Sequence, residues 1–520
     1  MSQTPLYKWS TTIKKSDNAS VPKELALDVT SLGRRTLHGL MWMLGQNVLA
    51  RVCSFLSQIA LAALLAPADF GVIGLSYTVI NIASALTNIG IDEVIIQRNR
   101  ALRFWAGPVF WISFGIALLA GVLVTLFAPV AAIIYKTPEL IGLVAVLALS
   151  MPIGALSTLP GMMVRARMHF GFFAIYGTLE TVAVAVITVA FAWGGLGVYS
   201  FVVPIPIAAA VRALVWWKLA APGVNIRLKL KRWKYVVGKT AITFTSRTLL
   251  AIIGQGDYVV LGLTTNHTAV GSYYFAFRLA AQPLWMLAGN FSGVLFPVLV
   301  QFKSDPSRQG AAALKASILL SFCIMPLAFI QAGIAEPLVT SFFGQKWALS
   351  VPMIQLLSVG LALDAVSWIA GTLINARGEF RAGLNYLLFQ TPIFFILVFI
   401  GSLLDNAVGV AWAVFIYYAV TQPVFVWAVY KRLNITALQV SLIYLKPMSY
   451  AAIAVGFGLA ISLLPVFADH PLVRVVIIGV LGVAVYTTLV RWLASEVWNE
   501  LWSRVTNAFG RHAAPAVLEA

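Results

Sequence analysis

The sequence predicts an all-α integral membrane protein with about 14 transmembrane helices, in two pseudo-symmetric six-helix lobes followed by two C-terminal helices. Its composition is the first reason: 60% of the 520 residues are hydrophobic and 10% are charged, with a mean hydropathy of +0.89. Soluble domains carry about 25% charged residues. The second reason is the recurrence of apolar segments of about 20 residues, each long enough to cross a hydrocarbon core of about 30 Å. Lipid offers backbone amides no partners, so these segments are expected to be helices.

The apolar segments follow one another from Thr36 to the C-terminal region. They are expected near residues 36–66, 71–97, 104–134, 139–164, 172–193, 196–220, 240–263, 269–300, 311–335, 350–375, 384–404, 407–430, 447–467 and 471–493.

Basic residues gather in every second connection between these segments, which sets the expected orientation. The formal net charge is +18, but its residues form no single patch, so a nucleic-acid partner is not expected. Cytoplasmic loops carry the excess of Lys and Arg. The sequence therefore predicts a multi-pass membrane protein with both termini in the cytoplasm. The basic connections include Arg98 to Arg103, Arg165 to Arg167, Arg227 to Lys234, Lys303 to Lys315, Arg377 to Arg381 and Lys431 to Arg432.

A long basic connection divides the chain into two similar halves. Gly71 and Gly271 hold matching places in them, and each precedes a tyrosine-bearing helix. With six helices in each half, both halves begin on the same side of the membrane, so the repeat is parallel. The expected parts are a cytoplasmic tail (1–35), an N-lobe (36–220), a basic linker (221–239), a C-lobe (240–430), helices 13 and 14 (447–493) and a cytoplasmic tail (494–520).

One segment, Thr240 to Leu263, combines a membrane-spanning length with two charges, Arg247 and Asp257. Ten residues of helix separate them by about 15 Å along the axis and about 80° around it, so no salt bridge is expected but both can face one lumen. A charge at bilayer depth costs several kcal/mol, and such residues usually face a polar cavity or a partner. This helix is therefore predicted to line a solvated pathway.

Further polar residues recur on single faces of the apolar helices. The residues predicted to bind substrate in a cationic lumen are Arg51, Arg247, Arg278, Asn47, Gln58, Asn81 and Gln282. The residues predicted to couple an ion or to pair with an arginine are Asp257, Glu180 and Asp364. The alternative is that the uncharged members hydrogen-bond neighbouring helices as structural links. Guanidinium groups match phosphate oxygens bidentately, so an arginine-lined lumen favours an anionic ligand.

No catalytic pattern is apparent in the sequence. The chain lacks a Gly-x-x-x-x-Gly-Lys-Ser/Thr nucleotide loop, and its five histidines and two cysteines are scattered. No cofactor, metal site or enzymatic activity is expected.

Several short motifs, taken in order, are similar to those of a known family. They are Ala66 to Gly71, Val164 to Phe170 followed by Glu180, Gly195 to Ser200, Asp257 with Val270 to Tyr274, Phe296-Pro297, Phe343 to Trp347 and Ala376 to Glu379. Over residues 36–430 the chain resembles the polysaccharide transporters, lipid-linked oligosaccharide flippases of the larger group that includes the multidrug and toxin extrusion antiporters. Within that family it resembles the colanic-acid-exporter-like branch.

The resemblance implies a two-lobed bundle that opens alternately to either side of the membrane. It implies a polyprenyl (undecaprenyl) diphosphate glycan as substrate, flipped for exopolysaccharide biosynthesis, an H⁺ or Na⁺ gradient as the energy source, and contact with polysaccharide polymerase or export machinery. Two other transport functions stay open. A drug or organic-cation antiporter would need an acidic cavity, whereas a peptidoglycan-precursor flippase would also need a basic one. A membrane-embedded glycan polymerase or ligase would need a larger outer loop than this sequence has.

Overall fold

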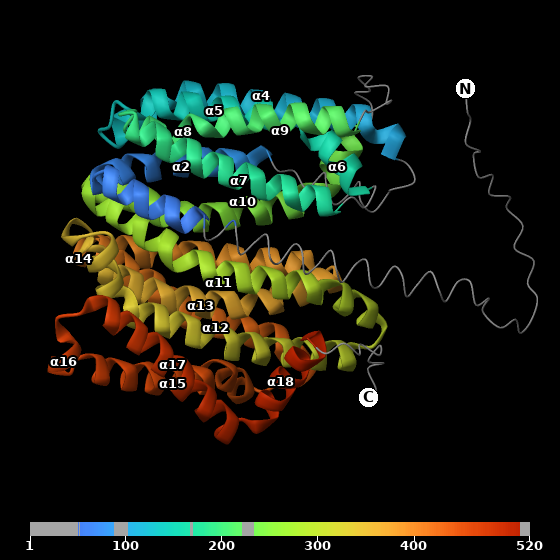
Figure 1. Cartoon of the computed structure of the whole chain (residues 1–520). Helices are drawn as coiled ribbons and strands as arrows, with labels where there is room; N and C mark the ends of the chain where they lie inside the picture. The colour runs from blue at the N-terminus through green and yellow to red at the C-terminus, as the bar shows by residue number, and fades with distance from the viewer. Residues whose placement is uncertain (1–49, 51–52, 88–101, 167–169, 221–232, 510–520) are drawn as a thin grey trace, which may run out of the picture.

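The computed structural model describes residues 50, 53–87, 102–166, 170–220 and 233–509. Long helices run side by side through the whole of this part, from the blue N-terminal helices to the red C-terminal ones (Figure 1). Within these described ranges, ten helices are long and apolar enough to cross a membrane, and two shorter apolar helices, Cys53–Leu64 and Leu140–Leu156, accompany them. The expected all-α membrane fold is confirmed.

The N-lobe follows the expected order of crossings. Its elements are the first helix Cys53–Leu64, α2 Pro67–Thr87, α4 Leu102–Ile134, α5 Leu140–Leu156, α6 Thr158–Ala166, α7 Phe170–Trp193, α8 Tyr199–Val202 and α9 Pro204–Ala220. The crossing expected over 139–164 is divided at Ser157, which caps α5 through its backbone N–H. Pro160, which has no backbone N–H to donate, lies in the first turn of α6, where helices tolerate proline.

The C-lobe consists of longer helices. Its elements are α10 Trp233–Thr264, α11 His267–Gln301, η3 Phe302–Ser304, α12 Pro306–Phe342, η4 Gln345–Trp347, α13 Ser350–Arg377, α14 Phe380–Tyr430 and η5 Lys431–Leu433. Asp405 and Asn406 interrupt α14, with φ of −149° and +46°, so this element makes the two crossings expected at 384–404 and 407–430. Its two halves pack closely, because a Cβ on Gly401 would lie 2.3 Å from the Gly409 carbonyl oxygen.

The chain ends with α15 Ala437–Ser462, α16 Pro465–Ala468, α17 Pro471–Leu493 and α18 Ser495–Phe509. α15 begins well before the expected start at residue 447, because Thr436 and Gln439 form a capping box that nucleates a polar first turn. The region expected only as a C-terminal tail contains α18, in which Trp498 and Trp502 stack with ring centroids 5.7 Å apart.

The packing of these elements determines where the two lobes meet. In the N-lobe, α5 packs against α4 and α9, and in the C-lobe α13 packs against α11, α12 and α14. α15 and α17 cover α12 at one edge of the bundle (Figure 1). α2 packs against both α10 and α11, so this helix carries most of the junction between the lobes.

Candidate functional site at the junction of the lobes

The helices α2 and α11 cross at direct backbone contact. A Cβ on Gly71 would lie 2.0 Å from the His267 carbonyl oxygen, and a Cβ on Gly271 would lie 1.7 Å from the Pro67 carbonyl oxygen. The contact is reciprocal. Pro67, four residues before Gly71, supplies the carbonyl that faces Gly271, and His267, four residues before Gly271, supplies the carbonyl that faces Gly71. Only glycine permits so close an approach of two backbones. The two glycines matched by their positions in the sequence are therefore in contact across the junction.

A tyrosine cluster, defined here as Tyr77, Tyr258, Tyr273 and Tyr274, lies beside this crossing. Tyr77 of α2 stacks on Tyr274 of α11, with ring centroids 6.4 Å apart and planes 6° apart. Tyr258 of α10 meets Tyr273 and Tyr274 edge-on at 5.4 and 5.9 Å. The Tyr77 hydroxyl donates to the Phe201 carbonyl oxygen at 3.1 Å. Three helices from both lobes thus meet through aromatic rings with polar ends.

Two charged side chains adjoin the tyrosine cluster. Asp257 is 2% exposed, and its carboxylate accepts from the Tyr273 hydroxyl at 2.8 Å and from the Tyr258 backbone N–H at 2.9 Å. Arg278 donates to the Tyr274 hydroxyl at 3.1 Å and lies over the Tyr274 ring at 5.6 Å. A buried carboxylate and a guanidinium are therefore both linked to α11 tyrosines at the junction.

A second connection between the lobes, called here the interlobe latch, comes from η4. Lys346 Nζ donates to the carbonyl oxygens of Ala63 at 3.2 Å and Leu65 at 3.0 Å, and Trp347 Nε1 donates to the Ala62 carbonyl oxygen at 3.2 Å. The last carbonyls of a helix lack partners within that helix and carry partial negative charge. A C-lobe ammonium and indole therefore cap the C-terminal end of the first N-lobe helix.

The indole of the interlobe latch is fully buried among aromatic residues of both lobes. Trp347 packs against Phe70 with ring centroids 4.9 Å apart and against Phe275 with centroids 4.2 Å apart. Phe343 in turn meets Phe55 of the first helix at 6.5 Å. Aromatic pairs of this kind contribute about 0.5–1.5 kcal/mol beyond their buried area.

These contacts gather where the first helix and α10 end and where α2 and α11 begin. His267, the first residue of α11, also hydrogen-bonds Thr137 of the loop after α4. Farther along, Leu86 of α2 is 46% exposed and Trp285 of α11 is 40% exposed. The lobes are therefore held together at the end where α2 and α11 begin.

The structure places the predicted lumen residues of the N-lobe as follows. Asn47 and Arg51 lie outside the described residues. Gln58 is buried in the first helix, and its Nε2 has no hydrogen-bond partner among the described residues. Asn81 is exposed on α2 and donates to Gln255 of α10 at 3.4 Å, which adds a polar contact across the junction.

In the C-lobe, three predicted lumen residues lie on the two helices that meet α2. Arg247 is exposed on α10, whereas Asp257 on the same helix is buried. Arg278 and Gln282 are half-buried on α11 and, spaced four residues apart, lie on one helical face. The structure therefore brings Arg278 and Asp257 to the junction and leaves Arg247 at an exposed position.

The two remaining acidic residues have separate partners. Glu180 of α7 forms an ion pair with Arg212 of α9 at 2.9 Å, inside the N-lobe. Asp364 of α13 accepts from Trp368 Nε1 at 3.1 Å, inside the C-lobe. Among the described residues there is no group of three or more His, Cys, Asp or Glu side chains that could hold a metal ion.

The sequence did not single out the interlobe latch or the tyrosine cluster as functional. Lys346 and Trp347 were noticeable only as part of a motif, because nothing in a sequence indicates that main-chain carbonyls 281 or more residues away are their acceptors. Tyr273 and Tyr274 were noticeable through the motif that joins Asp257 with Val270 to Tyr274.

Residues 60–352 match the family model described as "Polysaccharide biosynthesis protein". The succinoglycan biosynthesis transport protein ExoT of Rhizobium meliloti is 24% identical over 308 residues, 59% of this chain and 62% of that protein. The chain thus spans less than two thirds of the length of that relative. The lipopolysaccharide biosynthesis protein WzxC of Escherichia coli is 24% identical over 394 residues, 73% of this chain and 78% of WzxC. The teichuronic acid biosynthesis protein TuaB of Bacillus subtilis is 23% identical over 400 residues, 73% of this chain and 80% of TuaB.

Two of the solved structures that share the fold are a flippase and a multidrug resistance transporter. The lipid II flippase MurJ in an inward closed conformation matches with a TM-score of 0.70 at 13% identity, covering 87% of this chain and all (100%) of MurJ. An inward-facing multidrug resistance MATE family transporter matches with a TM-score of 0.61 at 16% identity, covering 75% of this chain and 94% of that chain. At such identities the likeness concerns the fold alone. The family model covers more than half of the chain, and this protein therefore belongs to the family described as polysaccharide biosynthesis proteins.

Proposed function

We propose that this protein is a flippase of the bacterial inner membrane, which moves an oligosaccharide on a polyprenyl diphosphate from the cytoplasmic to the outer leaflet for exopolysaccharide biosynthesis. The observation that carries the proposal is the junction itself. Two helical lobes join at one end, and an arginine lies on α11 about two turns beyond the glycine crossing. A diphosphate needs such a cation when it leaves water for the membrane interior.

The junction also supports an inward-opening state. By the positive-inside tendency, the basic connections Arg377 to Arg381 and Lys431 to Arg432 are cytoplasmic, which puts the starts of α2 and α11 on the outer side. The glycine crossing and the interlobe latch then close the outer end. Of the two solved structures described above, the MATE family transporter is inward-facing, whereas MurJ is in an inward closed conformation. In this proposal both termini and the basic linker 221–239 are cytoplasmic.

The charged residues then divide into two roles. Arg278, with Arg247 and Arg51, would attract the diphosphate, with Asn47, Gln58, Asn81 and Gln282 as polar lining. Asp257, held by Tyr273 between the lobes, would couple H⁺ or Na⁺ movement to the opening of the junction. Glu180 already neutralises Arg212 inside the N-lobe, so its role is charge pairing. Asp364 is a further candidate for ion coupling.

The charges at the junction also bear on the two alternative functions, a drug antiporter and a peptidoglycan-precursor flippase. A drug antiporter would place an acidic residue where its cationic substrate passes, whereas Asp257 has both carboxylate oxygens engaged and Arg278 faces the junction. A peptidoglycan-precursor flippase shares the basic requirement. Against it, the named relatives act in succinoglycan, lipopolysaccharide and teichuronic acid biosynthesis. Contact with polysaccharide polymerase or export machinery is part of the proposal.

The test is a deletion in the native host, with lipid extracts and secreted polymer analysed together. The expected result is loss of polymer, with complete repeat units retained on the carrier in the inner leaflet. Repeat units accumulating in the outer leaflet would indicate a polymerisation defect, and normal polymer with raised drug sensitivity would favour the antiporter. Arrest of cell-wall synthesis with normal polymer would favour the peptidoglycan precursor.

A further inference from the structure

A pocket of about 470 Å³ lies away from the junction, between α10 and the connections that precede α14 and follow it. Ile242 of α10 forms one wall, Gly378 to Ala382 form a second, and Arg432 of η5 forms a third. Its volume falls within the range of about 300–1,000 Å³ typical of small-molecule sites. Gly378 shapes the wall, because it ends α13 with a φ of +77°, a conformation that favours glycine.

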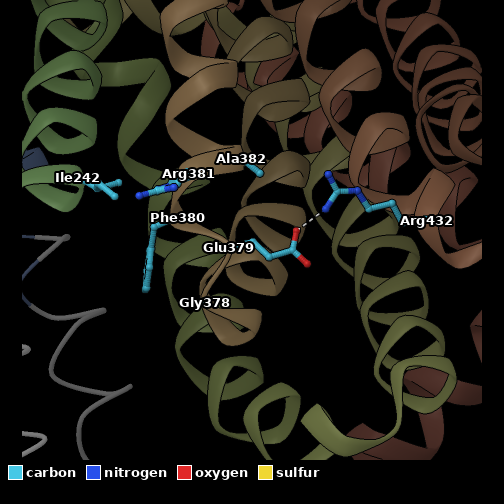
Figure 2. A pocket seen from close by; sticks show the side chains of 7 residues that line it. All are labelled: Ile242, Gly378, Glu379, Phe380, Arg381, Ala382 and Arg432. Carbon is cyan, nitrogen blue, oxygen red and sulfur yellow. Dashed lines mark hydrogen bonds and ion pairs between the residues drawn. The ribbon is translucent and has the colours of Figure 1, made fainter.

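The charges in the pocket do not cancel. Figure 2 shows Glu379 facing Arg432, and these two form an ion pair. Arg381 extends instead toward Ile242 on the opposite wall. Among the residues that the structure describes, Arg381 has no hydrogen-bond or ion-pair partner. Two guanidinium groups and one carboxylate leave one positive charge in the pocket, and the fork of a guanidinium fits phosphate oxygens.

The remaining walls are apolar, which distinguishes this pocket from a site for a soluble anion. Ile242 and Ala382 line it, and Phe380 is 45% exposed beside Arg381. The connection at Gly378 and the one at Lys431 both mark helix ends, so the pocket lies where a transmembrane bundle meets the lipid headgroups. A cation beside apolar walls at that depth matches a phosphate with methylene groups attached.

We propose that this pocket binds the phosphate group of a membrane lipid, with Arg381 as its main ligand, Arg432 as a second donor, and Ile242 and Phe380 against the first methylene groups. The proposal rests on the proposed function only for the assignment of the pocket to the cytoplasmic leaflet. Lipid bound there would link α10 to the start of α14. The lipid is either a glycerophospholipid of that leaflet or a polyprenyl diphosphate carrier, since both present a phosphate ester on an apolar chain.

The test is native mass spectrometry of the full-length protein in detergent, titrated separately with phosphatidylglycerol and with undecaprenyl diphosphate. Arg381→Ala is expected to weaken binding of the preferred lipid about tenfold, as the loss of one charge-assisted contact implies. Arg491→Ala is the matched control, because it removes the same charge from an exposed position in the last turn of α17. Ile242→Trp fills the pocket without a change in charge and is expected to weaken binding as well.

Each outcome is informative once all variants elute and melt like the wild type. Preferential loss of phosphatidylglycerol identifies a phospholipid site, and preferential loss of undecaprenyl diphosphate identifies a carrier-lipid site. Equal binding by the Arg381 and Arg491 variants overturns the proposal, and so does full binding by Ile242→Trp. Because the readout is lipid binding in detergent, a negative result leaves the host deletion test of the proposed function unaffected.

Discussion

Arg278 holds its guanidinium within reach of both lobes, because its partner Tyr274 stacks on Tyr77. We expect Arg278→Ala to reduce polymer export by at least tenfold, since a diphosphate would lose its cation at the junction. Arg278→Lys keeps the charge but loses the planar fork, so its export is expected to lie between that of the wild type and that of Arg278→Ala. The measurement is secreted polymer in a deletion strain complemented at equal membrane abundance. Wild-type export by Arg278→Ala would remove this residue from the transport path.

Asp257 differs from Arg278 in having both carboxylate oxygens occupied by donors from the protein. Asp257→Asn preserves the size of the side chain and removes its charge. We expect export by this variant to lose its dependence on the ion gradient, because the remaining amide cannot exchange a proton or neutralise Na⁺.

Tyr273→Phe is the companion variant for Asp257, since it keeps the carboxylate and removes one donor. It is expected to retain gradient dependence. The measurement is export or lipid flipping in proteoliposomes with imposed H⁺ or Na⁺ gradients. An unchanged profile for Asp257→Asn would assign this carboxylate a structural role.

At the scale of the helix, the crossing of α2 and α11 makes a sharp prediction. In Gly271→Ala the new Cβ would lie 1.7 Å from the Pro67 carbonyl oxygen, so the two helices must separate. We expect a lower melting temperature and reduced export, because α2 and α11 are held together by close packing of their backbones and would lose that packing.

Gly293→Ala on the same helix is the control for Gly271→Ala, because a Cβ there has nothing within 4 Å. Alanine is favoured over glycine in a helix interior by about 1 kcal/mol, so this variant is expected to be neutral or slightly stabilised. Equal melting temperatures for the two variants would contradict the crossing as described.

The helices also show which parts of the architecture a sequence can predict. Apolar length and basic loops located the crossings, because both follow directly from the membrane as solvent. Capping at Thr436 escaped that reasoning because it depends on a few polar contacts. The amphipathic α18 escaped it because a helix of 15 residues with one polar face does not have the apolar length of a crossing. The spacing of Arg247 and Asp257 allowed both to lie on one face of α10, yet Arg247 is exposed and Asp257 is buried. The packing of α10 against its neighbours decides this exposure, and a sequence does not show that packing.

For the whole molecule, the interlobe latch predicts that export requires the two lobes to part at this end. Lys346 Nζ lies 3.2 Å from the Ala63 carbonyl oxygen, so Ala63→Cys with Lys346→Cys is within reach of a short thiol cross-linker. In a background with Cys53 and Cys323 replaced by Ser, we expect cross-linking to stop export and cleavage of the linker to restore it. Each single-cysteine variant controls for the loss of the native side chain. Continued export by a fully cross-linked protein would show that this end need not open.

The acceptors of the interlobe latch have a consequence for the evolution of the chain. Lys346 and Trp347 bind main-chain oxygens at positions 62, 63 and 65, and every amino acid supplies such an oxygen. Substitutions at those three positions therefore leave the acceptors in place, and buried Ala62 and Leu65 are constrained by packing and not by these hydrogen bonds. Positions 346 and 347 are constrained by the hydrogen bonds themselves. In a family alignment we expect no covariation between the two sides of this contact. Methods that infer contacts from correlated substitutions would then miss one of the strongest links between the lobes.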